Sequence, residues 1–251
     1  MTAKPLAIIT GGKRRLGAEI ATKLAAAGYA LALVSHLDTP PEAPLAAALK
    51  TYQTEWHTFT SDLRTGYPAD VIGGISAHFG RTPDLLVNNA AMFGQDDWQT
   101  MTLETLEAHF RLNLFAPLLL AQALVKAAGA EARPAIVNIL DQRIVNPHRD
   151  QMSYTLSKQA LAASVRSMAA SFAGRARYNG VAPGLVISTD DYTADQESRL
   201  AEMMPLGKLP SPSAVADAVV FLAQAQDVTG QVIFVDGGAH LKSFDRDFMH
   251  L

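Results

Sequence analysis

The chain has 251 residues with 21 basic and 24 acidic side chains, and its net charge of −3 gives no support for binding to nucleic acid or to a membrane. It contains no cysteine, which excludes disulfides and thiolate metal sites and fits a reducing cytoplasm, the location that we expect. The seven histidines show no ligand spacing, so no metal site is expected.

Short apolar runs alternate with stretches of helical periodicity, and no linker-like segment divides them. Met1–Pro5 leads straight into the first run, so no signal peptide fits, and the most apolar stretch, 112–125, is shorter than the roughly 20 residues that span a bilayer. Strands are predicted at 6–10, 30–36, 56–60, 84–88, 134–140, 175–181 and 231–235. Helices are predicted at 16–27, 67–79, 102–129, 152–173 and 212–225, the last with Ser211 as N-cap and Pro212 in its first turn.

This alternation is typical of an α/β fold. We expect one domain over residues 1–251, with a Rossmann-type, doubly wound parallel sheet of about seven strands and helices on both faces. Such a fold places its ligands at the carboxyl ends of the strands.

A glycine-containing turn, Gly11-Gly-Lys-Arg-Arg-Leu-Gly17, joins the first strand to the first helix. Backbone N–H groups and the positive end of the helix dipole at such a turn face a pyrophosphate, and the glycines allow it to approach closely. The segment therefore predicts a phosphate-binding loop and not merely a connection between two elements.

Tyr154 and Lys158 stand four residues apart in the predicted helix 152–173, so the phenol and the ammonium share one helix face. A neighbouring cation lowers the pKa of a phenol, and we expect Tyr154 to exchange a proton near neutral pH. Asp141 stands thirteen residues before the tyrosine.

Six motifs, in order, resemble those of the short-chain dehydrogenase/reductase family over nearly the whole chain. They are Thr10-Gly-Gly-Lys-Arg-Arg-Leu-Gly17, Asn88-Asn-Ala-Ala91, Asn113 with Pro117, Asp141 with Tyr154 and Lys158, Pro183-Gly184, and Thr229-Gly-Gln with Asp236-Gly-Gly238. The resemblance implies an NAD(P)-dependent oxidoreductase in which Asp141, Tyr154, Lys158 and Asn113 form the catalytic group. Asn113 resembles the asparagine at a helix distortion that anchors a water in the proton relay.

Two departures from the family pattern occur together. Arg15 stands in the middle glycine position of the loop, and Asp141 stands where most relatives carry serine. Both are features of the pteridine reductase branch, as is Phe93, which stacks on the pterin ring in that branch, and the ending Asp236–Leu241 is similar to its bacterial members. The resemblance implies substrate contacts at Arg15, Phe93, Asp141 and Tyr154.

The resemblance also implies cofactor contacts throughout the chain. They are expected at Gly11, Lys13, Arg14, Arg15, Leu16, His36, Asp62, Leu63, Asn89, Ala90, Tyr154, Lys158, Pro183 and Gly184. Asp62 matches the aspartate that binds the adenine amino group in relatives, although a turn aspartate is an equally good interpretation.

Cofactor preference depends on the end of the second strand, where a carboxylate would bind the adenosine 2′-hydroxyl of NAD and repel the 2′-phosphate of NADP. The strand ends at His36 with no acid before Asp38, and Lys13, Arg14 and Arg15 lie in the adjacent loop. This cluster favours NADPH, while Asp38 is the argument against it.

A carboxylate at position 141 changes the expected chemistry. An ionised Asp141 would oppose the oxyanion that forms when a ketone is reduced, whereas it would accept hydrogen bonds from the ring N–H groups of a pterin. We therefore expect reduction of a C=N bond in a dihydropterin or dihydrofolate-like substrate. The alternatives are a carbonyl reductase for a 3-oxoacyl thioester or sugar ketone, and a non-catalytic NADPH-binding protein.

Two further expectations concern the substrate lid and the assembly. The lid is expected at about 185–208, with Asp190, Asp191 and Tyr192. Most family members are tetramers, which implies a homotetramer that uses helices 102–129 and 152–173. Small side chains offer close helix contact on the second of these, at Ala160, Ala163, Ser164, Ser167 and Ala170.

Overall fold

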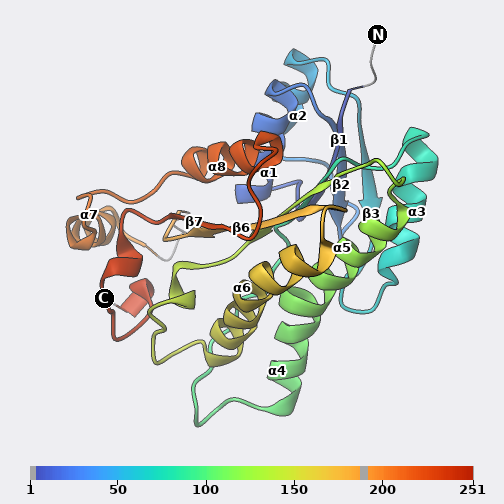
Figure 1. Ribbon diagram of the computed structural model, residues 1–251. Coiled ribbons are helices and arrows are strands. Elements are labelled where there is room, and N and C mark those ends of the chain that lie inside the picture. Colours follow the sequence, from blue (N-terminus) through green and yellow to red (C-terminus); the bar gives the residue numbers. More distant parts are fainter. Residues whose placement is uncertain (1–3, 187–191, 251) are drawn as a thin grey trace.

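The computed structural model describes residues 4–186 and 192–250, and its centre is one parallel sheet (Figure 1). The strands are β1 (Leu6–Thr10), β2 (Ala30–Ser35), β3 (Trp56–Thr60), β4 (Leu85–Asn88), β5 (Ala135–Ile139), β6 (Arg177–Pro183) and β7 (Val232–Val235). All six neighbouring pairs are parallel, in the order β3-β2-β1-β4-β5-β6-β7. The predicted Rossmann-type sheet of seven strands is confirmed.

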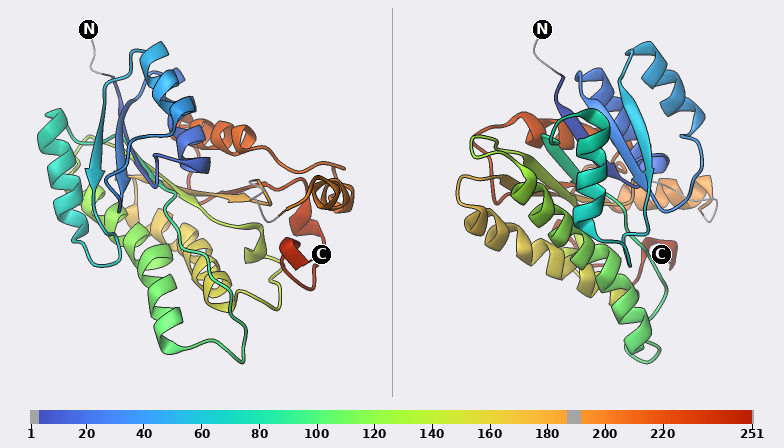
Figure 2. Two further views of the ribbon diagram at one scale, coloured as in Figure 1. Left: turned by 180° about the vertical axis from the view of Figure 1, so that it is seen from behind. Right: turned by 90° about the vertical axis from the view of Figure 1, so that its right-hand side faces the viewer.

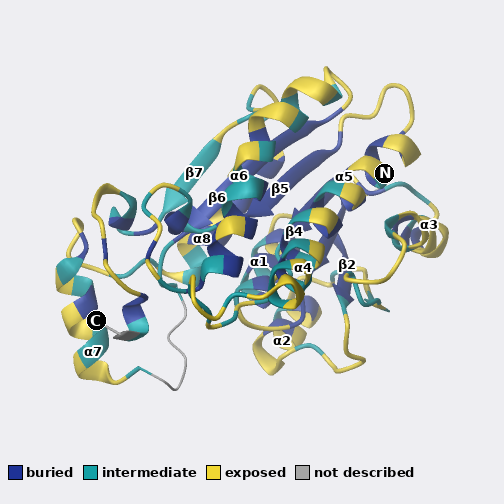
Figure 3. Ribbon diagram, turned by 90° about the horizontal axis from the view of Figure 1, so that it is seen from below, coloured by how far each residue is buried: buried dark blue, intermediate teal, exposed yellow. Residues whose placement is uncertain are grey.

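Helices cover both faces of the sheet (Figure 2). α1 (Arg15–Ala26), α2 (Ala43–Thr51) and α8 (Pro212–Gln224) lie on one face; α3 (Pro68–Phe79), α5 (Ala116–Ala127) and α6 (Met152–Phe172) lie on the other. Because successive side chains of a strand point to opposite faces, Ala7 and Ile9 of β1 pack beneath the first group and Leu6 and Ile8 beneath the second. Both faces of the central strands are therefore buried (Figure 3).

The helix predicted at 102–129 is interrupted. α4 (Leu103–Phe110) leads into a π-helical turn, Arg111–Phe115, and only then into α5. Pro117 has no N–H to donate to the carbonyl of Asn113, so a regular α-helical ladder fails at this point. By length and composition alone, 103–127 is the one helical stretch in the described parts of the chain that would suffice to cross a membrane, and 50% of its most apolar window is buried.

Other boundaries also differ from the prediction. β6 begins at Arg177 and not at 175, because Ala173 and Gly174 turn the chain through positive φ after α6. α2 was not predicted, since three prolines precede or enter it; Pro44 falls in its first turn, where a missing N–H has no effect. The predicted cap of α8 is confirmed, with the Ser211 hydroxyl accepting from the Ala214 N–H at 3.1 Å.

The predicted lid contains one further helix, α7 (Ala194–Met203), which begins with a capping box formed by Thr193 and Gln196. Asp190 and Asp191, which the lid prediction named, fall in 187–191 and lie outside the described residues. Leu200 of α7 packs with Phe244 and Phe248 of the C-terminal segment. Helix α7 and this segment lie side by side in Figures 1 and 3.

Candidate active site

A pocket opens where the strand order reverses. β1 lies between β2 and β4, so the connections that follow β1 and β4 diverge and leave a crevice at the carboxyl edge of the sheet. A cavity of about 610 Å³ occupies this crevice, a volume typical of ligand sites. The predicted cofactor residues that line it are Gly11, Lys13, Arg14, Arg15, Leu16, His36, Asp62, Leu63, Asn89, Ala90 and Tyr154.

The loop from β1 to α1 has the shape of a phosphate cradle. Gly11 has a φ of +66°, and a Cβ on Gly17 would lie 2.1 Å from the Gly11 carbonyl oxygen, so no larger residue fits there. Arg15, which replaces a family glycine, keeps a left-handed φ of 51°. The backbone at Arg15 therefore has a conformation that glycine adopts freely, and the N-terminus of α1 faces the cavity.

Thr10 and Asn89 join the two loops that border the crevice. The Thr10 hydroxyl accepts hydrogen bonds from the backbone N–H groups of Asn89 and Ala90, each at 3.0 Å. The Asn89 side chain donates to the Thr10 carbonyl at 2.9 Å. The floor of the pocket is consequently fixed before any ligand binds.

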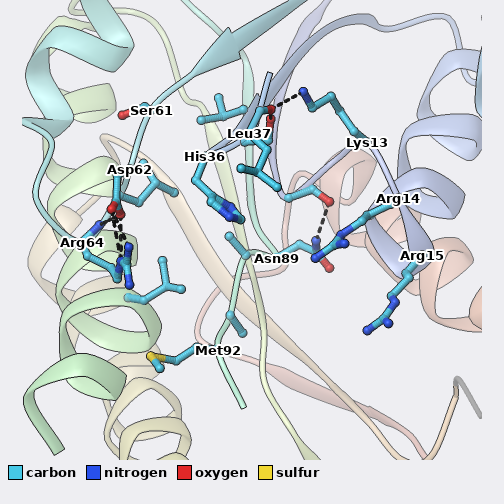
Figure 4. A pocket seen from close by; sticks show the side chains of 18 of the residues that line it. Lys13, Arg14, Arg15, His36, Leu37, Ser61, Asp62, Arg64, Asn89 and Met92 are labelled. Carbon is cyan, nitrogen blue, oxygen red and sulfur yellow. Dashed lines mark hydrogen bonds and ion pairs between the residues drawn. The ribbon is translucent and has the colours of Figure 1, made fainter. Parts of the chain in front are cut away.

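Positive charge gathers at one end of the cavity (Figure 4). Arg14 and Arg15 are exposed, and neither guanidinium has an ion-pair partner within residues 4–186 and 192–250. Arg14 and His36 face the same space. Lys13 was expected to be free to bind a phosphate. Its buried ammonium instead donates to the carbonyls of Leu37 and Thr39 at 2.7 and 2.6 Å.

Arg64 is a pocket residue that the sequence reasoning missed. It forms a fork with Asp62, with Nη2 to Oδ2 at 2.7 Å and Nε to Oδ1 at 3.0 Å. These bonds lower the pKa of Asp62 to about 2, so the carboxylate is ionised at neutral pH. Its position two residues after a predicted site aspartate was the available signal. Asp38 is exposed and is not among the residues that line the cavity.

The predicted catalytic residues meet where β5 and α6 approach, and of these Tyr154 lines the cavity, whereas Asp141, Lys158 and Asn113 lie behind it. The Tyr154 hydroxyl donates to Asp141 Oδ2 at 2.9 Å. The Lys158 ammonium donates to the Ile139 carbonyl at 2.7 Å and lies 5.9 Å from the centroid of the Tyr154 ring. Phe93 contacts the same ring edge-on, with centroids 4.9 Å apart, and is half exposed.

The expected lowering of the tyrosine pKa is wrong for this arrangement. Burial, and then the charge of Asp141, raise the pKa of Tyr154 well above its ordinary value. Burial lowers the pKa of Lys158 to about 8, and the ammonium is directed to a carbonyl instead of the phenol. Tyr154 is therefore held in its protonated form, which suits a proton donor.

Asn113 occupies the π-helical turn, as its expected helix distortion requires. It is buried, and its side chain exchanges two hydrogen bonds with the backbone of Met92 at 2.9 and 3.0 Å. It also donates to the Ser157 hydroxyl at 3.0 Å, which in turn donates to the Tyr154 carbonyl at 2.6 Å. Asn113 thus joins a pocket-lining loop to the helix that carries the tyrosine; the predicted relay water stays a prediction.

Three of the predicted cofactor residues lie beyond the cavity lining. They are Lys158, Pro183 and Gly184. Gly184 closes β6 against β7 by donating to the Val235 carbonyl at 3.1 Å, and a Cβ there would lie 2.9 Å from the Cα of Asp236. Its small size thus keeps the strand ends together.

A second charged group beside the tyrosine was also missed. The buried guanidinium of Arg143 lies 5.6 Å from the Phe93 centroid and 5.8 Å from that of Tyr154. It forms an ion pair with Asp247 of the C-terminal segment. No local pattern in the sequence marks this contact, although Arg143 stands two residues after Asp141.

The glycine cradle at a helix N-terminus, the crevice at the switch point and a protonated tyrosine define a dinucleotide-dependent oxidoreductase. A protein-family model described as enoyl-(acyl carrier protein) reductase matches residues 11–240. The chain belongs to the short-chain dehydrogenase/reductase family.

Its relatives are named for several substrate types, among them pterins, 3-oxoacyl thioesters and sugar alcohols. Pteridine reductase 1 of Leishmania tarentolae is 31% identical, covering 94% of this chain and 96% of the relative. The 3-oxoacyl-[acyl-carrier-protein] reductase of Homo sapiens is 30% identical, over 93% of this chain and 97% of the relative. The structure of FolM alternative dihydrofolate reductase 1 from Brucella suis, in complex with NADP, has a TM-score of 0.86 and 29% identity, covering 95% of this chain and 96% of that chain.

Proposed function

We propose that the protein is an NADPH-dependent pteridine reductase, which reduces a C=N bond of a dihydropterin or dihydrofolate-like substrate to the tetrahydro form. The observation that carries this proposal is the hydrogen bond of 2.9 Å from the Tyr154 hydroxyl to Asp141. A carboxylate occupies the position from which a serine would orient a ketone oxygen, and carboxylates accept hydrogen bonds but do not donate them when ionised.

Each residue of the site has a separate role in the proposed reaction. NADPH, when bound in the cradle, supplies the hydride to the electron-poor carbon. Tyr154 holds a proton for the adjacent nitrogen, since burial and Asp141 keep the phenol protonated. Asp141 orients the hydroxyl and accepts from N–H groups of the heterocycle, and Phe93, half exposed beside Tyr154, offers a face for its ring.

The fit of the cofactor is supported by the loop and its charges. Gly11 and Gly17 leave room for a pyrophosphate at the N-terminus of α1. The guanidinium groups of Arg14 and Arg15, which have no ion-pair partner among the described residues, and the exposed His36 favour a cofactor with an adenosine 2′-phosphate. The NADP complex of the Brucella suis relative supports the same preference.

A homotetramer is the assembly that we propose. Leu103, Phe115 and Leu119 on the α4–α5 side are exposed. On α6, Ala163, Ser167 and Ala170 of the predicted small face are exposed as well. Apolar and small side chains that face solvent on two long neighbouring helices are suited to helix packing between subunits.

The test is an NADPH oxidation assay with dihydromonapterin, dihydrobiopterin, dihydrofolate and a panel of ketones that includes a 3-oxoacyl thioester. The proposal predicts turnover of a pterin or of dihydrofolate, abolished in Tyr154→Phe. Turnover of ketones alone would support the alternative that the human 3-oxoacyl relative favours. NADPH binding without turnover of any compound would identify a non-catalytic binding protein.

A further inference from the structure

The guanidinium of Arg143 lies close to three of the side chains assigned to substrate contact, Phe93, Asp141 and Tyr154. Its Nε lies 3.9 Å from Asp141 Oδ1, and its backbone N–H donates to the same oxygen at 2.9 Å. Its Cζ lies within 6 Å of the ring centroids of both Phe93 and Tyr154. Arg143 itself is 4% exposed, so this cation acts in a medium where charges are weakly screened.

A segment far away in sequence fixes the direction of this guanidinium. Arg143 Nη2 donates to Asp247 Oδ2, and Nη1 donates to the side-chain oxygen of Gln151. Asp247 is 4% exposed and is fixed in turn: its backbone N–H donates to Asp150 at 2.8 Å and its Oδ1 accepts from the Met249 N–H at 3.0 Å. Both oxygens of the Asp247 carboxylate are therefore engaged, which defines one orientation for its partner.

The C-terminal segment that carries Asp247 is held in place by apolar packing. Phe244 and Phe248 are buried with Leu200 and Met204 at the end of α7. Their rings also contact His148 edge-on, with centroids 6.1 and 5.6 Å away. Burial, and then the charge of Arg143, lower the pKa of His148, which favours the neutral form of this ring at neutral pH.

We propose that Arg143 is a positioning residue, oriented by Asp247, that holds Asp141 and Tyr154 in their working geometry, so that Asp247 and the buried Phe244 and Phe248 that fasten it support the active site. The inference rests on the proposed function for the identity of the substrate, although the geometry of the four side chains does not depend on it. Arg143 acts through Asp141 and Tyr154 rather than on the substrate directly.

The charges around Tyr154 give this role a distinctive signature. The charged groups that face the phenol are Asp141 at the end of β5, Arg143 in the turn that follows, Lys158 on α6 and Asp247 on the C-terminal segment. After burial, Asp141 and Asp247 raise the pKa of Tyr154, whereas Arg143 lowers it. Removing Asp247 and removing Arg143 must therefore move the titration of Tyr154 in opposite directions.

The experiment combines kinetics with a titration that needs no substrate. Asp247→Asn keeps the shape of the side chain but removes its charge; Arg143→Gln removes the cation, and Arg143→Lys keeps the charge without the fork. Each variant is also made with 3,5-difluorotyrosine at position 154, because its more acidic phenol brings the titration into an accessible range for ¹⁹F NMR. Asp245→Asn is the matched control, since Asp245 lies in the same C-terminal segment but forms an exposed ion pair with Arg149.

We expect Asp247→Asn to reduce kcat by about 10-fold, the scale for losing a supporting contact, with KM for NADPH unchanged. The difluorotyrosine titration should move to lower pH in Asp247→Asn and to higher pH in Arg143→Gln, with no change in Asp245→Asn. Compared with Arg143→Gln, Arg143→Lys should bring the pH of the difluorotyrosine titration part of the way back to the wild-type value, but it should not restore kcat. Wild-type titration and wild-type kcat in Asp247→Asn would overturn the inference, whether or not Arg143→Gln folds.

Failure of the proposed function has a different outcome. If no pterin is reduced but the two titrations still move in opposite directions, the positioning role holds and the substrate assignment is wrong. If a pterin is reduced and the titrations do not move, the pterin assignment holds and Arg143 with Asp247 serves only to fasten the C-terminal segment.

Discussion

Lys158 lies one helical turn from Tyr154, yet its ammonium donates to the carbonyl of Ile139 at 2.7 Å and not to the phenol. The hydroxyl of Tyr154 instead donates to Asp141 at 2.9 Å. The lysine therefore connects α6 to the end of β5, whereas burial and the Asp141 carboxylate keep the tyrosine protonated.

The first prediction concerns the proton donor. Tyr154→Phe should lower kcat by roughly 100-fold or more, since a positioned acid contributes on that scale, while NADPH affinity stays nearly unchanged. Stopped-flow kinetics and fluorescence titration of NADPH measure the two quantities. The exposed Tyr67, changed to Phe, is the control; full activity in Tyr154→Phe would remove this residue from the mechanism.

The second prediction concerns pH and Lys158. The pKa of Lys158 is about 8 in the folded protein, against 10.5 for a lysine in water. The charged form is thus disfavoured by folding, and the resulting loss of stability is fully present below about pH 8 and is relieved as the pH rises toward 10.5. The stability of Lys158→Met relative to wild type should therefore decrease between about pH 7 and about pH 10. Urea unfolding at both values measures it; a constant difference would contradict the assigned burial.

The third prediction concerns cofactor preference. Arg14→Ala should reduce the preference for NADPH over NADH by about 10-fold or more, because charge-assisted hydrogen bonds contribute about 1.5–3 kcal/mol. The kcat/KM for NADH should not change. Arg133→Ala provides a control, because that exposed arginine lies outside the pocket. A wild-type enzyme that binds NADH more tightly would show that Asp38 governs the adenosine site.

The fourth prediction concerns the substrate. Phe93→Ala should raise KM for a pterin about 2- to 12-fold, which corresponds to the roughly 0.5–1.5 kcal/mol of an aromatic contact beyond its buried area. Asp141→Ser should lower pterin turnover and introduce weak ketone reduction, while Asp141→Asn tests the charge at constant shape. Steady-state kinetics with one pterin and one ketone distinguish these outcomes. Wild-type kinetics in all three variants would leave a reductase of unknown substrate.

The fifth prediction concerns assembly. Light scattering at micromolar concentration should give the mass of a tetramer of the 26.8 kDa chain. Leu119→Glu should dissociate it into smaller species, since a charge on a helix interface is left unpaired. Tyr67→Glu, at an exposed site on another surface, should leave the mass unchanged. A monomeric wild-type protein would refute the assembly.

The sheet and the cofactor loop could be predicted because their signals are local. Runs such as 6–10 and 85–88 are apolar on both faces, as buried parallel strands are. The glycine cradle is formed by seven consecutive residues, 11–17. The α4–α5 helix could not be placed correctly by periodicity alone, because the π-turn depends on how Pro117 and Asn113 act together.

Site residues that belong to a sequence motif could be predicted, whereas site residues that only the tertiary structure brings together could not. Tyr154, Lys158 and Asp141 stand within one short stretch. Arg143 and Asp247 are 104 positions apart, and their contact depends on the path of the chain after β7. The predicted direction of the Tyr154 pKa shift was wrong because spacing reveals the neighbouring lysine, whereas burial and the charge of Asp141 raise the pKa in the folded protein.

Arg15 illustrates a conflict between folding and binding at one backbone position. Its φ of 51° is a conformation that glycine adopts freely, and that other L-residues adopt at about 1–2 kcal/mol above the right-handed form. The chain is thus less stable than it would be with glycine at this position, and in return a guanidinium stands at the mouth of the pocket. Selection for thermostability would favour glycine at this position, and such variants would lose ligand affinity as they gained stability.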